Sequence, residues 1–99
     1  MFGMQVRFHA RPGKGRELAR VLLEAGDALA DLEACRIYLV SRLPDSEDAV
    51  WVTEVWTDAE AHSASLELEA TKALIERSRP LIAGAPEPTE LTPLGGKGL

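Results

Sequence analysis

The chain has 99 residues, of which 45% are apolar, and it carries a formal net charge of -5 with an isoelectric point near 5.0. This length and composition predict one domain with a small hydrophobic core. The eleven basic residues are scattered among sixteen acidic ones, so the charge pattern gives no footprint for nucleic acid or for an anionic membrane surface. The expected partner is a small molecule or another protein.

The N-terminal residues, the length of the apolar runs and the cysteine content indicate where the protein is found and which bonds it can form. The N-terminal residues lack the basic and then apolar pattern of a secretion signal, and no apolar run reaches the roughly 20 residues that a spanning helix needs. We therefore expect a cytoplasmic protein with no membrane partner. Cys35 is the only cysteine, which excludes an internal disulfide and a thiolate metal cluster within one chain.

The first two elements follow from a change of period in the apolar residues. Residues 4–10 alternate between apolar and polar side chains, as in a strand with one apolar face. The segment 11–15 contains Pro and Gly and ends this strand. Apolar residues then recur at helical spacing over residues 18–32, opposite charged residues, which predicts an amphipathic helix.

A hairpin is expected next, because residues 35–42 and 49–56 are rich in apolar and aromatic residues and the polar segment 44–48 separates them. Both faces of these two strands are apolar. Two helices can cover only one face of a sheet, so a second subunit is expected to cover the other. The pattern predicts a homodimer in which two sheets pack against each other.

A second helical pattern runs from about Asp58 to about Arg79, with a break expected within residues 66–69 where the apolar stripe shifts. Thr57 and Glu60 have the spacing of a capping box, in which each side chain satisfies a free backbone N–H near the other. The helix is therefore expected to begin next to the end of the preceding strand.

The order of elements, completed by a Pro-bounded edge strand over residues 87–94, is βαββαβ. This order predicts an α+β, ferredoxin-like fold, in which an antiparallel sheet carries both helical regions on one face. We expect a single domain over residues 1–94 and a flexible C-terminal tail over residues 95–99.

Glu54, Trp56 and His62 are the strongest candidates for a functional site. Side chains alternate along a strand, so Glu54 and Trp56 are expected on the same face of the sheet. His62 lies one turn into the following helix and can fold back over that face. A carboxylate, an indole and an imidazole would then converge on one pocket.

Four segments of the sequence resemble the antibiotic biosynthesis monooxygenase domain family. They are Arg11–Lys14, Glu33–Tyr38, Glu54–Trp56 together with His62, and Pro80–Ile82. Members of this family are ferredoxin-like subunits that pair into dimeric α/β barrels, and the resemblance implies the same assembly here. The family includes cofactor-free oxygenases of quinols and polycyclic phenols, haem-degrading enzymes and members with no established substrate.

The resemblance implies a cofactor-independent monooxygenase that oxidises a small hydroxylated aromatic or quinol with dioxygen. A deprotonated, electron-rich phenol can itself activate dioxygen, so no flavin, haem or metal is needed. His62 is the expected base, because imidazole changes charge near neutral pH. Trp56 is expected to form the wall on which the ring stacks, and Tyr38 and Glu54 to orient the substrate hydroxyl or His62. His9 is a reserve base if its strand face lines the cavity.

Other interpretations stay open. Trp56 can be a core residue, and His62 can pair with Glu54 or cap a backbone carbonyl in a purely structural role. The chain would then be a non-catalytic dimeric module that binds a small apolar ligand or serves as a structural unit. The chain also has no asparagine, an amide that oxygenases of the family often place near the reacting oxygen. A haem-degrading monooxygenase is a weaker alternative, because residues 74–79 contain no histidine that could ligate iron.

Overall fold

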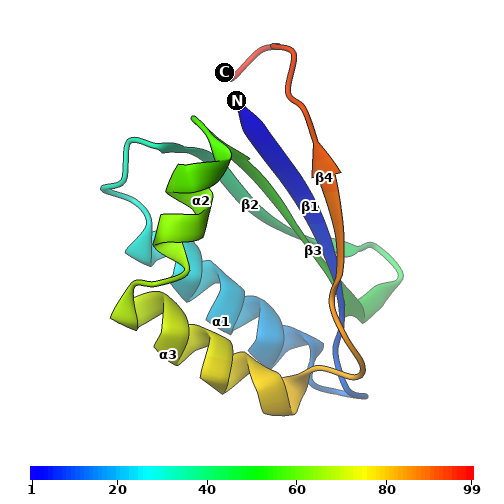
Figure 1. Cartoon of the computed structure of the whole chain (residues 1–99). Helices are drawn as coiled ribbons and strands as arrows, with labels where there is room; N and C mark the ends of the chain where they lie inside the picture. The colour runs from blue at the N-terminus through cyan, green and yellow to red at the C-terminus, as the bar shows by residue number, and fades with distance from the viewer.

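The computed structural model describes all 99 residues as four strands and three α-helices (Figure 1). The elements in chain order are β1 (Phe2–His9), α1 (Gly15–Ala28), β2 (Cys35–Leu43), β3 (Ser46–Trp56), α2 (Ala59–Ser65), α3 (Glu69–Ser78), the short 3-10 helix η1 (Arg79–Leu81) and β4 (Glu87–Leu91). The predicted ferredoxin-like α+β fold is confirmed, with its second helical region divided into α2 and α3.

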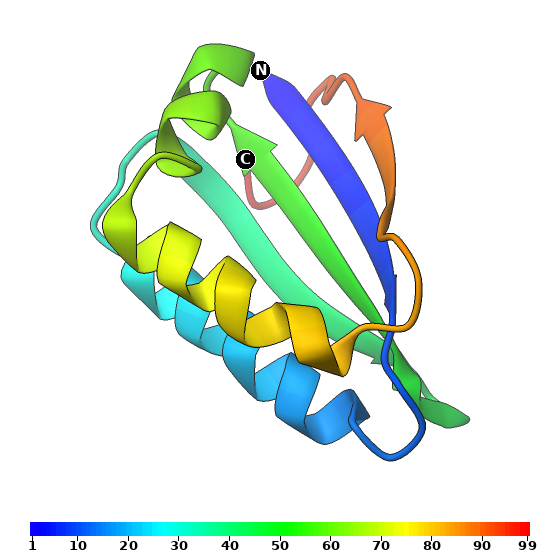
Figure 2. The ribbon, with the colours of Figure 1, turned by 60° about the horizontal axis from the view of Figure 1, so that its bottom comes forward.

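The four strands form one antiparallel sheet in the order β2-β3-β1-β4. Helices α1 and α3 lie side by side across one face of this sheet, and no helix covers the other face (Figure 2). The register places Met4 opposite Glu54 on β3 and opposite Glu90 on β4, while Glu54 also faces Tyr38 on β2. One row of residues across the sheet therefore brings Tyr38, Glu54 and Met4 together.

The core lies between the sheet and α1. Leu18 of α1 and Val50 of β3 have no exposed surface, and Val52 is 2% exposed. Side chains of this kind each contribute about 1.5 to 3 kcal/mol when they are removed from water. The helix can approach this closely because residue 15 is a glycine: a Cβ atom there would overlap the backbone carbonyl of Glu47.

The beginning of β3 also fixes the start of α1. The Asp48 carboxylate accepts hydrogen bonds from the backbone N–H of Gly15, at 3.0 Å, and of Gly13, at 3.2 Å. The bond to Gly15 satisfies a donor that a helix N-terminus otherwise leaves free, and the bond to Gly13 fixes the turn before the helix. Helix α1 is thereby held at a fixed position on the sheet.

The start of α2 differs from the prediction. The N-cap is Asp58, whose carboxylate accepts a hydrogen bond from the Ala61 N–H at 2.7 Å. The capping box between Thr57 and Glu60 is therefore wrong. Thr57 still belongs to the end of the sheet, because its N–H donates to the carbonyl of Ala34, and the adjacent ionised Asp58 is the stronger acceptor.

Other boundaries follow the predictions with local adjustments. The break expected within residues 66–69 is confirmed, since α2 ends at Ser65 and α3 begins at Glu69. Helix α1 ends at Ala28, four residues before the end of the apolar pattern, and Leu29 is buried in the turn that follows. Strand β4 ends at Leu91 instead of residue 94. None of the helices is long and apolar enough to cross a membrane.

The face of the sheet without helices, which we call the open face, is partly apolar. Alternation along the strands places on it Ile37, Leu39, Trp51, Val55 and Leu91. The side chain of Leu39 is 54% exposed and that of Leu91 is 48% exposed, whereas Val55 is 9% exposed. The Arg7 guanidinium lies over the Trp51 ring, 4.5 Å from its centre.

Candidate active site

A cavity of about 640 Å³ lies between the sheet and the three helices. Its walls are mainly apolar and come from β1, α1, α3 and the segment leading into β4. The apolar lining includes Met4, Val6, Phe8, Val21, Leu22, Leu29, Leu66, Leu74, Ile75 and Ile82. A cavity of this volume is of the size that holds a small organic ligand.

Four titratable side chains line this cavity: Tyr38, Glu54, His62 and Arg79. Tyr38 and Glu54 are cross-strand neighbours on β2 and β3, and His62 comes from α2. The side chains of Glu54 and His62 are only 12% and 13% exposed. Three of these four side chains, Tyr38, Glu54 and His62, therefore lie together at the buried end of a mainly apolar cavity.

Glu54 is held in place by Trp56. The indole Nε1–H donates to Glu54 Oε1 over 3.0 Å, along the same strand. The His62 Nε2 atom lies 3.9 Å from the same carboxylate oxygen. This distance is too long for a hydrogen bond, but it places the imidazole beside the carboxylate.

His62 is itself fixed between two aromatic rings. Phe2 stacks on the imidazole with ring centres 5.0 Å apart and planes 28° apart. Trp56 meets it edge-on, at 5.7 Å and 70°. Phe2 was not predicted to belong to the site, although its apolar alternation with Met4 on β1 was a signal for its face. Only the register, which pairs Phe2 with Trp56, places it next to α2.

Tyr38 stays a neutral phenol in this environment. Its ring packs against Gly26 of α1, where a Cβ atom would come within 3.0 Å of the ring. Burial raises the pKa of Tyr38 well above its ordinary value, and the negative charges of Glu54 and then Cys35 raise it further. Burial and Glu54 also raise the pKa of the Cys35 thiol. Tyr38 can therefore donate a hydrogen bond into the cavity but does not act as a base.

A family model described as "Antibiotic biosynthesis monooxygenase" matches residues 1–77. The chain belongs to the antibiotic biosynthesis monooxygenase family. A solved structure from Chloroflexus aurantiacus J-10-fl, provisionally assigned to the same family, is 37% identical, with 96% of this chain and 94% of that chain covered and a TM-score of 0.86.

Solved structures of lower sequence identity share the fold. A structure from Caulobacter crescentus CB15 is 23% identical and has a TM-score of 0.87, with 95% of this chain and 90% of that chain covered. A structure from Nitrosomonas europaea is 9% identical and has a TM-score of 0.90, with 96% and 100% covered. No curated protein matches the chain.

In this family member the cavity does not include every residue that the sequence suggested. Trp56 is 1% exposed and does not line the cavity, so a ligand there cannot stack on it. The expectation that Trp56 forms the stacking wall is wrong, because the indole is covered by its neighbours in the core. Its contact with the site is the hydrogen bond to Glu54.

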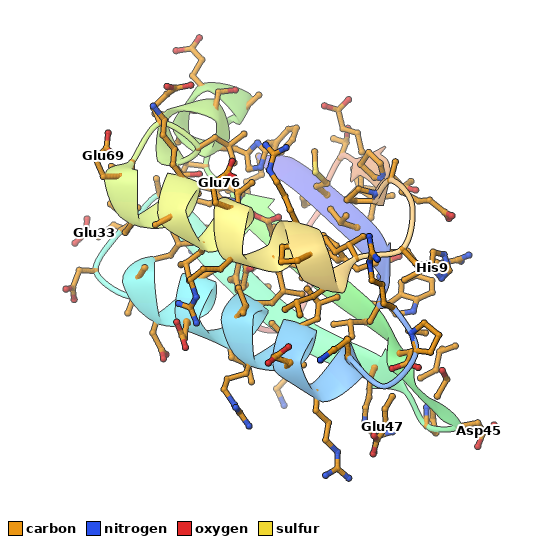
Figure 3. The ribbon with its side chains drawn as sticks, turned by 90° about the horizontal axis from the view of Figure 1, so that it is seen from below. His9, Glu33, Asp45, Glu47, Glu69 and Glu76 are labelled. Atoms are coloured by element: carbon orange, nitrogen blue, oxygen red, sulfur yellow. The ribbon has the colours of Figure 1, made fainter.

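His9 lies on the open face of the sheet, on the far side of β1 from the helices (Figure 3). Its Nε2 atom is 3.2 Å from the Glu87 carboxylate, and its side chain is 45% exposed. Arg7 shares the same carboxylate at 3.7 Å. The strand face that carries His9 does not line the cavity, so the condition for a reserve base is not met within this chain.

Proposed function

We propose that this chain is a cofactor-independent monooxygenase that oxidises a small hydroxylated aromatic or quinol with dioxygen. One observation supports the proposal most: an imidazole, a carboxylate and a neutral phenol meet at the buried end of an apolar cavity of about 640 Å³. Membership of the antibiotic biosynthesis monooxygenase family also supports this reaction class.

In this proposal His62 takes the proton from the substrate hydroxyl. Glu54 then stabilises the imidazolium from 3.9 Å, and its own position is fixed by the Trp56 N–H. Tyr38 donates a hydrogen bond to the phenolate oxygen, because its raised pKa keeps it protonated. These three side chains bind and orient the hydroxyl end of the ring.

The electron-rich phenolate supplies all four electrons that reduce dioxygen, so no external reductant is needed. It transfers one electron to dioxygen, and the two radicals combine to form a carbon–oxygen bond on the ring. Cleavage of the O–O bond leaves one oxygen atom in the resulting quinone, and the other leaves as water with two hydrogens from the substrate. The apolar walls exclude bulk water from the charged intermediates.

The test is oxygen consumption by purified, metal-free protein with a panel of dihydroxynaphthalenes and anthrone. We expect uptake well above the rate of uncatalysed autoxidation, unchanged by a chelator. If no member of the panel is consumed faster than in the blank while several bind in the cavity, the chain is a non-catalytic binding module instead.

We also infer that the functional unit is a homodimer joined through the open face. The supporting observation is that apolar side chains such as Leu39 and Leu91 are about half exposed on a sheet face that no helix covers. Burial of this face against a second copy would remove it from water and form a closed barrel-like sandwich of two sheets.

Sedimentation at micromolar concentration is expected to give twice the chain mass of 10.7 kDa. Leu39→Asp should shift the protein towards a monomer, because the charge lies in the interface. Leu23→Asp is the matched control, since Leu23 is 55% exposed on α1 and Leu39 is 54% exposed on the open face. A wild-type protein that sediments as a stable monomer would contradict the inference.

A further inference from the structure

The cavity has a defined mouth. Most of its lining is buried or half-buried, but six lining residues are exposed: Leu66, Ile75, Arg79, Gly84, Pro86 and Pro88. These residues lie on the α2–α3 connection, on α3 and η1, and on β4 and the segment that leads into it. A ligand therefore enters between α3 and β4, and the part of it that remains at the mouth is in contact with solvent.

Arg79 is the only arginine or lysine that lines this cavity, and it is at the mouth. Its side chain is 68% exposed, and its Nε atom lies 3.1 Å from Glu76 Oε1. Glu76 projects from the side of α3 that is turned away from α1 (Figure 3). The guanidinium is thus held over the rim by one exposed carboxylate, which another carboxylate can replace.

The charges at the two ends of the cavity have opposite signs. Glu54, 12% exposed, is at the buried end, and Arg79 is at the exposed end. A carboxylate on the ligand is disfavoured near Glu54, where two buried anions would repel. At the mouth the same carboxylate keeps part of its hydration and can pair with the guanidinium through two parallel hydrogen bonds.

We propose that the ligand of this cavity is an aryl acid, with a hydroxyl at the inner end and a carboxylate at the outer end, and that Arg79 binds the carboxylate. The assignment of the hydroxyl end rests on the proposed function, whereas the Arg79 subsite does not. The chain has a net charge of -5, so an anionic ligand is otherwise repelled, and Arg79 also favours its approach. This subsite sets which end of the ligand enters first.

The test is a binding measurement by calorimetry without oxygen. The probes are a hydroxynaphthoate, with hydroxyl and carboxylate at opposite ends of the rings, and its neutral methyl ester. Arg79→Gln should weaken binding of the acid by about three- to fivefold, in the upper part of the range of an exposed ion pair, and leave the ester unchanged. Glu76→Gln should strengthen binding of the acid, because it removes the competing carboxylate.

Arg77→Gln is the matched control. It removes the same charge from the last turn of α3, next to η1 and Arg79, but Arg77 pairs with Glu24 of α1, at 2.6 Å, and does not line the cavity. Its effect on the acid should therefore be small, which separates the local contact from the change in net charge.

The outcomes separate this subsite from the proposed function. Equal effects of Arg79→Gln on acid and ester, or equal effects of the Arg79 and Arg77 variants on the acid, would overturn the Arg79 subsite while leaving the oxygenase proposal intact. If binding follows the expected pattern but the separate oxygen-consumption assay shows no uptake, the result supports the subsite and counts against the oxygenase. If wild type binds neither probe, the subsite is overturned.

Discussion

His62→Gln is expected to slow quinol-dependent oxygen uptake by about 100-fold or more, which is the usual contribution of a general base. Glutamine has nearly the same length but cannot accept the substrate proton. Since the imidazole makes only ring contacts with Phe2 and Trp56 and a long contact with Glu54, the variant should melt close to wild type. The measurement is the rate in an oxygen electrode together with a thermal unfolding curve.

His9→Gln provides the matched control, because His9 is the second of the two histidines and lies outside the cavity. It should leave the rate unchanged. The role as base has a further signature: when the pH approaches the pKa of the substrate hydroxyl, the substrate ionises unaided and the deficit of His62→Gln should narrow. A deficit that is constant with pH would indicate a structural role for His62, and a normal rate would remove it from the mechanism.

Tyr38 is expected to ionise only as the protein unfolds in alkali. Burial and the nearby Glu54 raise its pKa in the folded state, while the unfolded chain has an ordinary phenol with a pKa of about 10. A raised folded-state pKa means that the stabilisation is complete below about pH 10 and is lost as the pH rises above it. The free energy of unfolding should therefore fall with pH in this alkaline range.

The sequence contains one tyrosine, so the near-ultraviolet absorbance of tyrosinate reports on Tyr38 alone. In a stepwise alkaline titration this absorbance and the far-ultraviolet circular dichroism should change together. Urea-unfolded protein should instead ionise near pH 10. Tyrosinate that forms near pH 10 with intact circular dichroism would contradict the environment assigned to Tyr38, and Tyr38→Phe should reduce the alkaline loss of stability.

The fold was predictable because the spacing of apolar residues along the chain distinguishes its strands from its helices. Alternation in β1 and helical spacing in α1 are strong signals, and the break before Glu69 follows from a shift of the apolar stripe. The start of α2 was less predictable. Thr57 and Asp58 are both good N-caps. The Thr57 N–H donates a hydrogen bond to the carbonyl of Ala34, which lies just before β2, and this contact between distant segments decides where α2 begins.

The sequence indicated which side chains gather near the start of α2, but it did not indicate which of them reach the cavity. Strand alternation places Glu54 and Trp56 on one face, and both do face α2. The difference between them arises from packing: Trp56 is covered, whereas Glu54 reaches the cavity. Phe2 and Arg79 were missed because each joins the site through an element distant in sequence, β1 in one case and η1 in the other.

The two tryptophans of the chain occupy opposite faces of one sheet. Trp56 borders the imidazole of His62, whereas Trp51 lies under the Arg7 guanidinium on the open face, with its indole N–H buried and unpaired. The molecule therefore carries two fluorophores in unlike surroundings. In variants that retain one indole each, emission from Trp56 is expected to report on the proposed ligand entering the cavity, and emission from Trp51 on the proposed contact between subunits, so the two events become separately visible in solution.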